Sequence, residues 1–286
     1  MNETNGNEDY ILIKEAVGGS KPALESLVRK YQNDIYNIAL KMVYYPDDAL
    51  DITQEVLIKV ITNLSSFRFE SRFSTWLYKI TVNHILNIKK IRAENILYSD
   101  FKVYGEAIDK TPDIQVDTNS AEMKIIVEEV KLTCLQGMLM CLDRKQRVAF
   151  VLGSIFAFPD TVCSEVMEIS RDNFRQILSR ARRDLGSFMS NKCGLIRKTN
   201  PCHCSKKTKS LIERGVVNPG NLLFNKDFTH SIESSARERL ESLDNFIEDD
   251  GSAIFRKMPY NEMPDFTLKI REILDSRRIK SIFNFN

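Results

Sequence analysis

Apolar residues recur at helical spacing along most of this chain, whereas strand signals are scarce. In residues 23 to 42, for example, Leu24, Leu27 and Val28 fall on one side of a helix, and Pro46 marks the turn that follows. We therefore predict an all-α fold. A chain of 286 residues is long enough for two or three domains rather than one.

Residues 67 to 92 combine cationic and aromatic side chains. The cations are Arg68, Arg72, Lys79, Lys89, Lys90 and Arg92, and the aromatic residues are Phe67, Phe69, Phe73, Trp76 and Tyr78. Because cations follow a phosphate backbone and aromatic faces stack on unpaired bases, this segment predicts contact with single-stranded DNA. Helical spacing favours the core for Phe73 and Trp76, which leaves Phe67, Phe69 and the cations for the strand.

The segment just upstream, residues 51 to 61, predicts a helix with one apolar face and one acidic face. The second face carries Asp51, Gln54, Glu55 and Ile58. A carboxylate-rich face is a poor surface for DNA, and an apolar side chain among polar groups is typical of a protein contact. A solvated helix face is the alternative that periodicity leaves open.

A helix-turn-helix pattern lies further along the chain. Residues 162 to 169 and 171 to 185 predict two helices across a short turn. The outer face of the second helix carries Arg175, Gln176, Ser179, Arg180 and Arg183. Arginine can address guanine edges or phosphates and glutamine can address adenine, so this face suits a major groove. A basic helix with a solvated face is the alternative.

These segments, in this order, resemble the extracytoplasmic-function sigma factors of bacterial RNA polymerase. Residues 47 to 56 and 67 to 83 are similar to region 2 of that family, and residues 173 to 182 occupy the place of the recognition helix of region 4. The resemblance implies a factor that binds core RNA polymerase, recognises the promoter −35 and −10 elements and promotes DNA melting. A separate anti-sigma factor is a further partner that it implies.

The resemblance also implies roles for individual residues. Polymerase contacts fall on Asp48, Asp51, Gln54, Glu55 and Ile58; −10 contacts fall on Phe67, Arg68, Ser71, Lys79 and Asn83; and −35 contacts fall on Arg171, Arg175, Gln176, Ser179, Arg180 and Arg183. One position departs from the family pattern. Glu168 stands in the turn where glycine is usual, which leaves open the turn geometry and the position of Arg171 and Arg175 that depends on it.

The expected organisation is two helical domains, a linker and a C-terminal helical extension. We expect an N-terminal tail (1–20), region 2 (21–94), a linker (95–121), region 4 (122–190), a Cys/His-rich basic segment (191–209) and an extension (210–286). The linker is expected because its polar, acidic residues lack periodicity. The extension is predicted to be folded from apolar residues that include Leu240, Leu243, Phe246, Ile247, Phe266, Leu268, Ile270 and Ile273.

The extension is not explained by the family pattern. One hypothesis is that it regulates sigma activity by touching one of the two DNA-binding domains. A protein-interaction appendage with no effect on initiation is the alternative.

Cys193, Cys202, His203 and Cys204 form a cluster of soft ligands among basic residues. Thiolate and imidazole groups suit zinc, but a Cys-x-Cys pair with one distant cysteine does not match the usual paired spacing. Zinc binding, redox sensing and incidental thiols therefore remain open. Three other cysteines, Cys134, Cys141 and Cys163, lie within apolar helical patterns and are predicted to be core residues.

Composition sets further limits. The net charge of +2 does not argue against nucleic acid, because local clustering of basic residues decides such binding. No apolar run approaches the roughly 20 residues that a bilayer span needs, so membrane insertion is not expected. The polar N-terminus lacks a signal pattern, which predicts a cytoplasmic protein whose cysteines are thiols or metal ligands.

Nothing in the sequence favours catalysis. Residues 18 to 21 lack the preceding glycine of a phosphate-binding loop, and the three histidines are scattered. His84 falls on an apolar stripe and is predicted to be packed. We therefore expect a protein that is not an enzyme and requires no cofactor. A helix-turn-helix regulator that binds duplex DNA without joining polymerase is the alternative, but it would need neither the acidic helix nor the aromatic loop.

Overall fold

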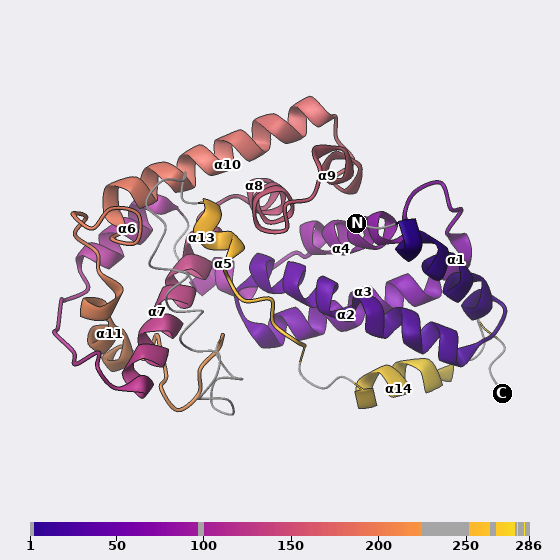
Figure 1. Cartoon of the computed structure of the whole chain (residues 1–286), viewed down its shortest axis with the longest axis horizontal. Coiled ribbons are helices and arrows are strands. Elements are labelled where there is room, and N and C mark those ends of the chain that lie inside the picture. The colour runs from indigo at the N-terminus through magenta and orange to yellow at the C-terminus, as the bar shows by residue number, and fades with distance from the viewer. Residues whose placement is uncertain are drawn as a thin grey trace.

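The computed structural model describes residues 3–96, 100–224, 252–263 and 267–277, together with Ile279 and Phe283. Within these residues the regular structure is helical, apart from one isolated bridge between Cys193 and Cys202. The predicted all-α class is therefore confirmed. The helices form an N-terminal bundle and a C-terminal bundle that lie side by side (Figure 1).

The N-terminal bundle contains four main helices and a short 3-10 turn. They are α1 (Glu3–Val17), α2 (Lys21–Val43), α3 (Pro46–Thr62), η1 (Leu64–Ser66) and α4 (Phe73–Asn87). Helix α2 is the centre of the bundle, because α1, α3 and α4 all pack against it. The side chain of Ser20 caps α2 by accepting a hydrogen bond from the backbone N–H of Ala23 at 3.3 Å.

The expected N-terminal tail is instead a helix of this bundle. Ile13 and Ala16 of α1 are buried in the core. The hydroxyl of Tyr31 donates to Asp9 at 2.5 Å, which ties α1 to α2. The expectation was wrong because the segment begins with polar residues and contains only a few apolar ones, so its sequence gives a weak helical pattern. Those few apolar residues nevertheless pack the helix against the bundle.

The C-terminal bundle includes the predicted helix-turn-helix. Its elements are α7 (Ala121–Met140), α8 (Arg144–Phe150), the π-helix η2 (Val151–Ile155), α9 (Asp160–Val166) and α10 (Arg171–Lys192). The short helix α5 (Arg92–Ile96) leads out of the N-terminal bundle. Helix α10 runs along one edge of the molecule, with α9 at one of its ends (Figure 1).

The predicted linker is not free of regular structure, because it contains α6 (Phe101–Asp109). Asp100 caps this helix by accepting from the N–H of Val103 at 2.9 Å. The ring of Phe101 packs against Phe188 of α10, with a centroid separation of 5.2 Å. Tertiary packing and an N-terminal cap therefore stabilise a helix that apolar periodicity in the sequence had not predicted.

The two bundles are joined through Arg147 of α8, which is only 2% exposed. Its guanidinium donates to the carbonyl oxygens of Met42, Leu139 and Leu142 at 2.7–2.9 Å. It also pairs with Glu94 at 3.2 Å. Because Met42 ends the central helix of one bundle and Leu139 lies in the other, one buried cation satisfies groups from both.

Glu94 is held by a second arginine, Arg144, at 2.6 Å. Burial of this carboxyl raises its pKa, but hydrogen bonds from Arg144 and the charges of both guanidinium groups outweigh that effect, so the pKa lies below its usual value. A further link is the side-chain amide of Gln136, which donates to the carbonyl of Leu40 at 2.5 Å.

Parts of the C-terminal extension pack onto both bundles. Its described helices are α13 (Ser252–Arg256) and α14 (Thr267–Asp275), together with the end of α11 (Cys204–Glu213), which begins in the Cys/His-rich segment. We call residues 252–263 the strap. Of the predicted extension core, Ile270 and Ile273 are buried, whereas Leu240, Leu243, Phe246, Ile247 and Phe266 lie outside the described residues.

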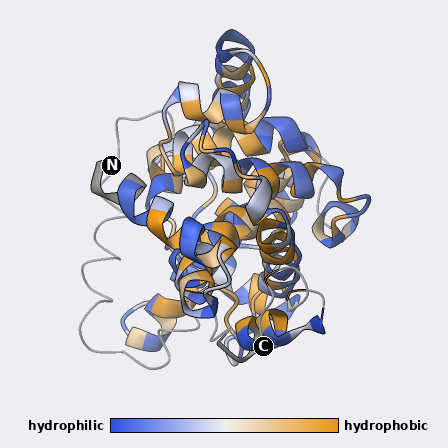
Figure 2. Ribbon diagram, turned by 90° about the vertical axis from the view of Figure 1, so that its right-hand side faces the viewer, coloured by the Kyte–Doolittle hydropathy of each residue, from blue (hydrophilic) through white to orange (hydrophobic). Residues whose placement is uncertain are grey.

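Apolar and polar residues are interspersed along the helices, as expected of amphipathic helices (Figure 2). Among the residues that the structure describes, no helix has the length and apolar content that a membrane span needs.

We expect Arg147→Ala to destabilise the protein by about 3 to 5 kcal/mol, because it strands buried carbonyl oxygens and leaves Glu94 with one partner fewer. Urea unfolding followed by circular dichroism measures the change. The matched control is Lys145→Ala on the same helix, whose side chain is exposed and whose loss should cost less than about 0.5 kcal/mol. Equal effects of the two substitutions would show that Arg147 does not join the bundles.

Candidate nucleic-acid and polymerase interface

The acidic face of α3 is largely open to solvent. Asp51 and Glu55 are exposed, and Asp48 and Gln54 are half-buried. The pKa of Asp48 is raised by desolvation, which the nearby charge of Arg92 partly offsets. The predicted face therefore exists as a set of neighbouring carboxylate and amide groups on one helix.

The sequence predicted that Ile58 projects from this face, but the structure shows it partly covered. Its side chain is half-buried and packs against the core. His84 of α4 is likewise packed, because its Nε2 lies 3.3 Å from Glu55 and its Nδ1 lies 2.5 Å from Lys59. Burial and the charge of Lys59 lower the pKa of His84, so it stays neutral at pH values where a free histidine begins to protonate.

The loop between η1 and α4 forms an open pocket of about 520 Å³. Residues of the predicted −10 set that line it are Phe67, Arg68, Ser71 and Lys79. Trp76 also lines it. Cationic, hydroxyl and aromatic groups around a pocket of this size can hold an unstacked base and its phosphate. Asn83 lies one helical turn beyond Lys79 on α4.

The aromatic residues of the loop are more buried than predicted. Phe67 is only 8% exposed and packs against Phe73 and Trp76, with ring centroids 5.5 and 5.4 Å apart. Its ring is therefore not free for stacking, and the sequence prediction was wrong on this point because four aromatic rings in a short segment bury one another. Phe69 is 42% exposed and lies 5.0 Å from the ring of Tyr10.

The helix-turn-helix keeps its turn despite the departure at Glu168. This residue has φ 55°, the left-handed conformation that glycine favours, and Ser170 then caps α10 by accepting from the N–H of Asn173 at 3.2 Å. The structure therefore resolves the turn geometry that the sequence left open. An L-residue in this conformation costs roughly 1 to 2 kcal/mol, so other contacts of Glu168 must offset that cost.

The outer face of α10 is open to solvent. Arg171, Arg175, Gln176, Ser179, Arg180 and Arg183 are all exposed. Two of the arginines are pre-positioned at the start of the helix, because Asp160 of α9 accepts from Arg175 Nε at 2.7 Å and lies 3.5 Å from Arg171. The hydrogen bond from Arg175 is the main reason that the pKa of Asp160 is lowered.

The structure brings the turn of the helix-turn-helix onto the predicted −10 surface. The carboxylate of Glu168 accepts from Lys79 Nζ at 2.7 Å and from Asn83 Nδ2 at 2.9 Å. Glu165, three residues earlier, lines the pocket itself. In this arrangement two carboxylates lie beside the predicted −10 residues, and their negative charge opposes the approach of a phosphate backbone from this side.

Sequence reasoning missed both glutamates as part of this surface. Glu165 and Glu168 belong to the DNA-binding half of the chain and gave no sign of facing α4. The one available signal was Glu168 itself, since a charged residue at a turn position suited to glycine needs a compensating contact.

Comparison with known proteins identifies the family. The family sequence pattern described as Sigma-70 region 2 matches residues 27–94, which run from α2 to α5. The ECF RNA polymerase sigma-E factor of Escherichia coli K12 is 38% identical over 175 residues, or 61% of this chain and 90% of that protein. The ECF RNA polymerase sigma factor SigW of Bacillus subtilis is 30% identical over 175 residues, covering 60% of this chain and 92% of that protein.

A solved structure, that of CnrH in complex with the cytosolic domain of CnrY, is also similar. It shares 19% sequence identity, with a TM-score of 0.42 over 64% of this chain and 97% of that one.

The helical fold and the region 2 match define a transcription initiation factor of the sigma-70 class. Within that class, the chain belongs to the ECF family of RNA polymerase sigma factors.

We expect Glu168→Gln to strengthen binding of single-stranded DNA several-fold. The substitution keeps the turn but removes an ion pair worth roughly 0.2 to 1 kcal/mol and one negative charge beside the pocket. Fluorescence anisotropy with a mixed-sequence oligonucleotide at low salt measures the change. Glu122→Gln, on the exposed start of α7, removes the same charge elsewhere and serves as the control. If both variants bind alike, Glu168 does not guard the −10 surface.

Proposed function

We propose that this sigma factor binds its partners through three surfaces. The acidic face of α3 binds core polymerase, the loop pocket binds the −10 strand, and the outer face of α10 binds the −35 element. The observation that carries the proposal is that four of the five predicted −10 residues line one pocket, while the predicted −35 residues share one exposed helix face. The function is binding rather than catalysis, and it belongs in the cytoplasm with RNA polymerase.

Core polymerase is the partner for α3. Asp51 and Glu55 present carboxylates to solvent, with Asp48 and Gln54 beside them. These groups suit a basic and polar partner surface, where charge complementarity would speed association and set orientation. Ile58 adds less than predicted, because part of its side chain already packs against the core.

The −10 element is the partner for the pocket. Arg68 and Lys79 would hold phosphates, and Ser71 and Asn83 would supply hydrogen bonds to a base edge. The energy to open the duplex would come from capture of an unpaired base, so this step needs no cofactor. Phe67 would support the pocket wall from below, since its own ring is covered.

The −35 element is the partner for α10. Arg175 and Arg180 are exposed on the face that would enter a major groove, with Gln176 beside Arg175. Arginine can pair with guanine through two hydrogen bonds, each such pair being worth about 1 to 3 kcal/mol of discrimination.

In vitro transcription with purified core polymerase and a promoter library tests these assignments. We expect Asp51→Ala with Gln54→Ala to weaken core binding, and Arg175→Ala with Arg180→Ala to abolish −35-dependent transcripts while leaving core binding intact. The control is Lys209→Ala, an exposed cation on α11 away from all three surfaces.

Two results would contradict the assignments. Core binding that survives the α3 substitutions would remove that face from the polymerase interface. Binding to promoter duplex without any protein-dependent transcript would favour a regulator that does not join polymerase.

Contacts made by the C-terminal extension support a role for it in regulating transcription initiation. Several hydrogen bonds join the strap to α2. Tyr260 donates to Asp34 at 2.5 Å, Asn37 and Asn261 bond each other through side chain and backbone at 2.8 and 2.9 Å, and the N–H of Met263 donates to Asn33 at 3.1 Å.

The other end of the strap meets the C-terminal bundle. Arg256 Nε donates to the carbonyl of Ser154 in η2 at 2.9 Å, and the ring of Phe255 packs edge-on against Phe150, with centroids 5.2 Å apart. The strap thus links the two bundles and favours the arrangement in which Glu168 covers the −10 surface. An anti-sigma factor would be a further means of control.

We expect Phe255→Ala with Arg256→Ala to loosen the two bundles and raise transcription with core polymerase, because the strap then loses its hold on η2. Small-angle X-ray scattering should show a larger radius of gyration. Arg271→Ala on the exposed side of α14 is the control. An expanded molecule with unchanged transcription would mean that the extension stabilises the fold without regulating initiation.

A further inference from the structure

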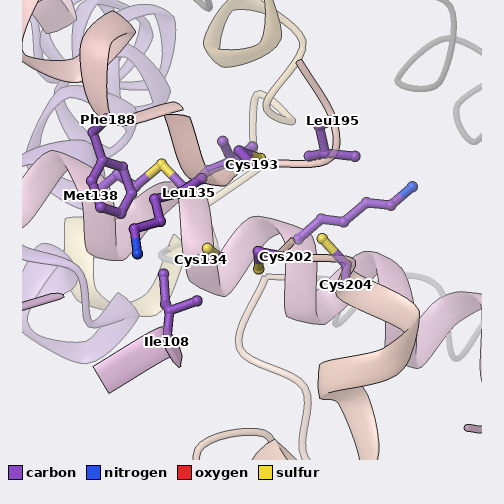
Figure 3. A pocket seen from close by; sticks show the side chains of 11 residues that line it. Ile108, Cys134, Leu135, Met138, Phe188, Cys193, Leu195, Cys202 and Cys204 are labelled. Carbon is purple, nitrogen blue, oxygen red and sulfur yellow. The ribbon is translucent and has the colours of Figure 1, made fainter. Parts of the chain in front are cut away.

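Four cysteines from separate parts of the sequence line one small cavity. They are Cys134 of α7, Cys193 at the end of α10, Cys202 in the following loop and Cys204 at the start of α11 (Figure 3). The cavity measures about 10 Å³. That volume accommodates about one water-sized particle.

The backbone is shaped to bring these thiols together. Cys193 and Cys202 form the isolated bridge, in which the N–H of Gly194 donates to the carbonyl of Cys202 at 2.9 Å. A Cβ atom on Gly194 would lie only 2.7 Å from that carbonyl oxygen. Glycine is therefore required for the end of α10 to approach the Cys-His-Cys segment this closely.

The remaining walls do not suit a trapped water molecule. Leu135, Met138, Phe188 and Leu195 are apolar, and although Lys131 and Lys192 also line the cavity, the surface that faces it is apolar. Thiols are weak hydrogen-bond partners. A buried water needs two to four polar partners, which these walls do not supply. Sulfur ligands instead select soft, closed-shell metal ions, of which Zn²⁺ takes four ligands in a tetrahedron at about 2.3 Å.

We propose that Cys134, Cys193, Cys202 and Cys204 together bind one Zn²⁺ ion. Each thiol releases its proton to solvent on binding, so the ion and four thiolates carry a net charge of −2. Lys131 and Lys192 also line the cavity, and their ammonium groups already pair with Glu128 and Asp109. The site would join α7, the end of the recognition helix and α11.

The ligand set differs from the one that the sequence indicated, because Cys134 takes the place of His203. The imidazole of His203 does not line the cavity and lies against Gly194, where a Cβ atom would be 2.8 Å from its Nδ1. Among the described residues, no group of three or more His, Cys, Asp or Glu is already arranged to hold a metal ion. The four thiols therefore have to close around the ion by rotation of their side chains.

The first experiment measures zinc in the purified full-length protein by mass spectrometry, followed by replacement with Co²⁺. We expect about one zinc per chain and a sulfur-to-cobalt charge-transfer band typical of tetrahedral thiolate ligation. Protein that contains no zinc, takes up no cobalt and carries a Cys193–Cys202 disulfide would overturn the proposal.

Matched variants identify the ligands. Cys134→Ser should weaken zinc binding at least tenfold, whereas Cys141→Ser and Cys163→Ser, at cysteines outside the cavity, should leave it unchanged. His203→Asn should also leave it unchanged. Full zinc binding by Cys134→Ser with loss in His203→Asn would restrict the site to the Cys-His-Cys segment and contradict the proposal.

A second readout covers the case in which Cys134→Ser folds poorly. A tight chelator should lower the melting temperature of the unaltered protein, and added Zn²⁺ should restore it. A melting temperature that does not respond to either would overturn the proposal independently of any variant.

Discussion

The arrangement of this protein depends on a buried cation at the junction of its two bundles. Arg147 is almost fully buried and satisfies backbone carbonyls that the ends of α2 and α7 leave open. Glu94 compensates its charge, and Arg144 holds Glu94 in place. Because a buried guanidinium without these partners would be costly, the junction tolerates little variation, and it fixes where α9 falls relative to α4.

That placement decides the state of the DNA-binding surfaces. The outer face of α10 is exposed, whereas the proposed −10 pocket has Glu165 in its lining and Glu168 paired with Lys79 at its side. The contact with Lys79 and Asn83 is exposed, and such contacts are weak. In the proposed function, a closed state held by these weak contacts and by the strap would be displaced by the stronger binding of polymerase and DNA, as expected of a two-state switch.

Several features could be read from the sequence because they depend on local periodicity or on residue type. The helices α2, α3 and α10, the exposed arginine face and the packed position of His84 all follow from apolar spacing. The helices α1 and α6 were missed, since their few apolar residues act only through contacts with α2 and α10. Phe67 was misjudged because composition does not show which aromatic ring covers another.

The sequence by itself thus determined the helical class, the family and the residue types of each surface, because these are encoded in spacing and in motifs of contiguous residues. Tertiary structure alone decided which distant residues meet: Glu168 with Lys79, Asn261 with Asn37, and Cys134 with the Cys-His-Cys segment. The physical reason is that these contacts depend on how helices are placed by buried groups such as Arg147, and a pattern within one helix carries no information about that placement.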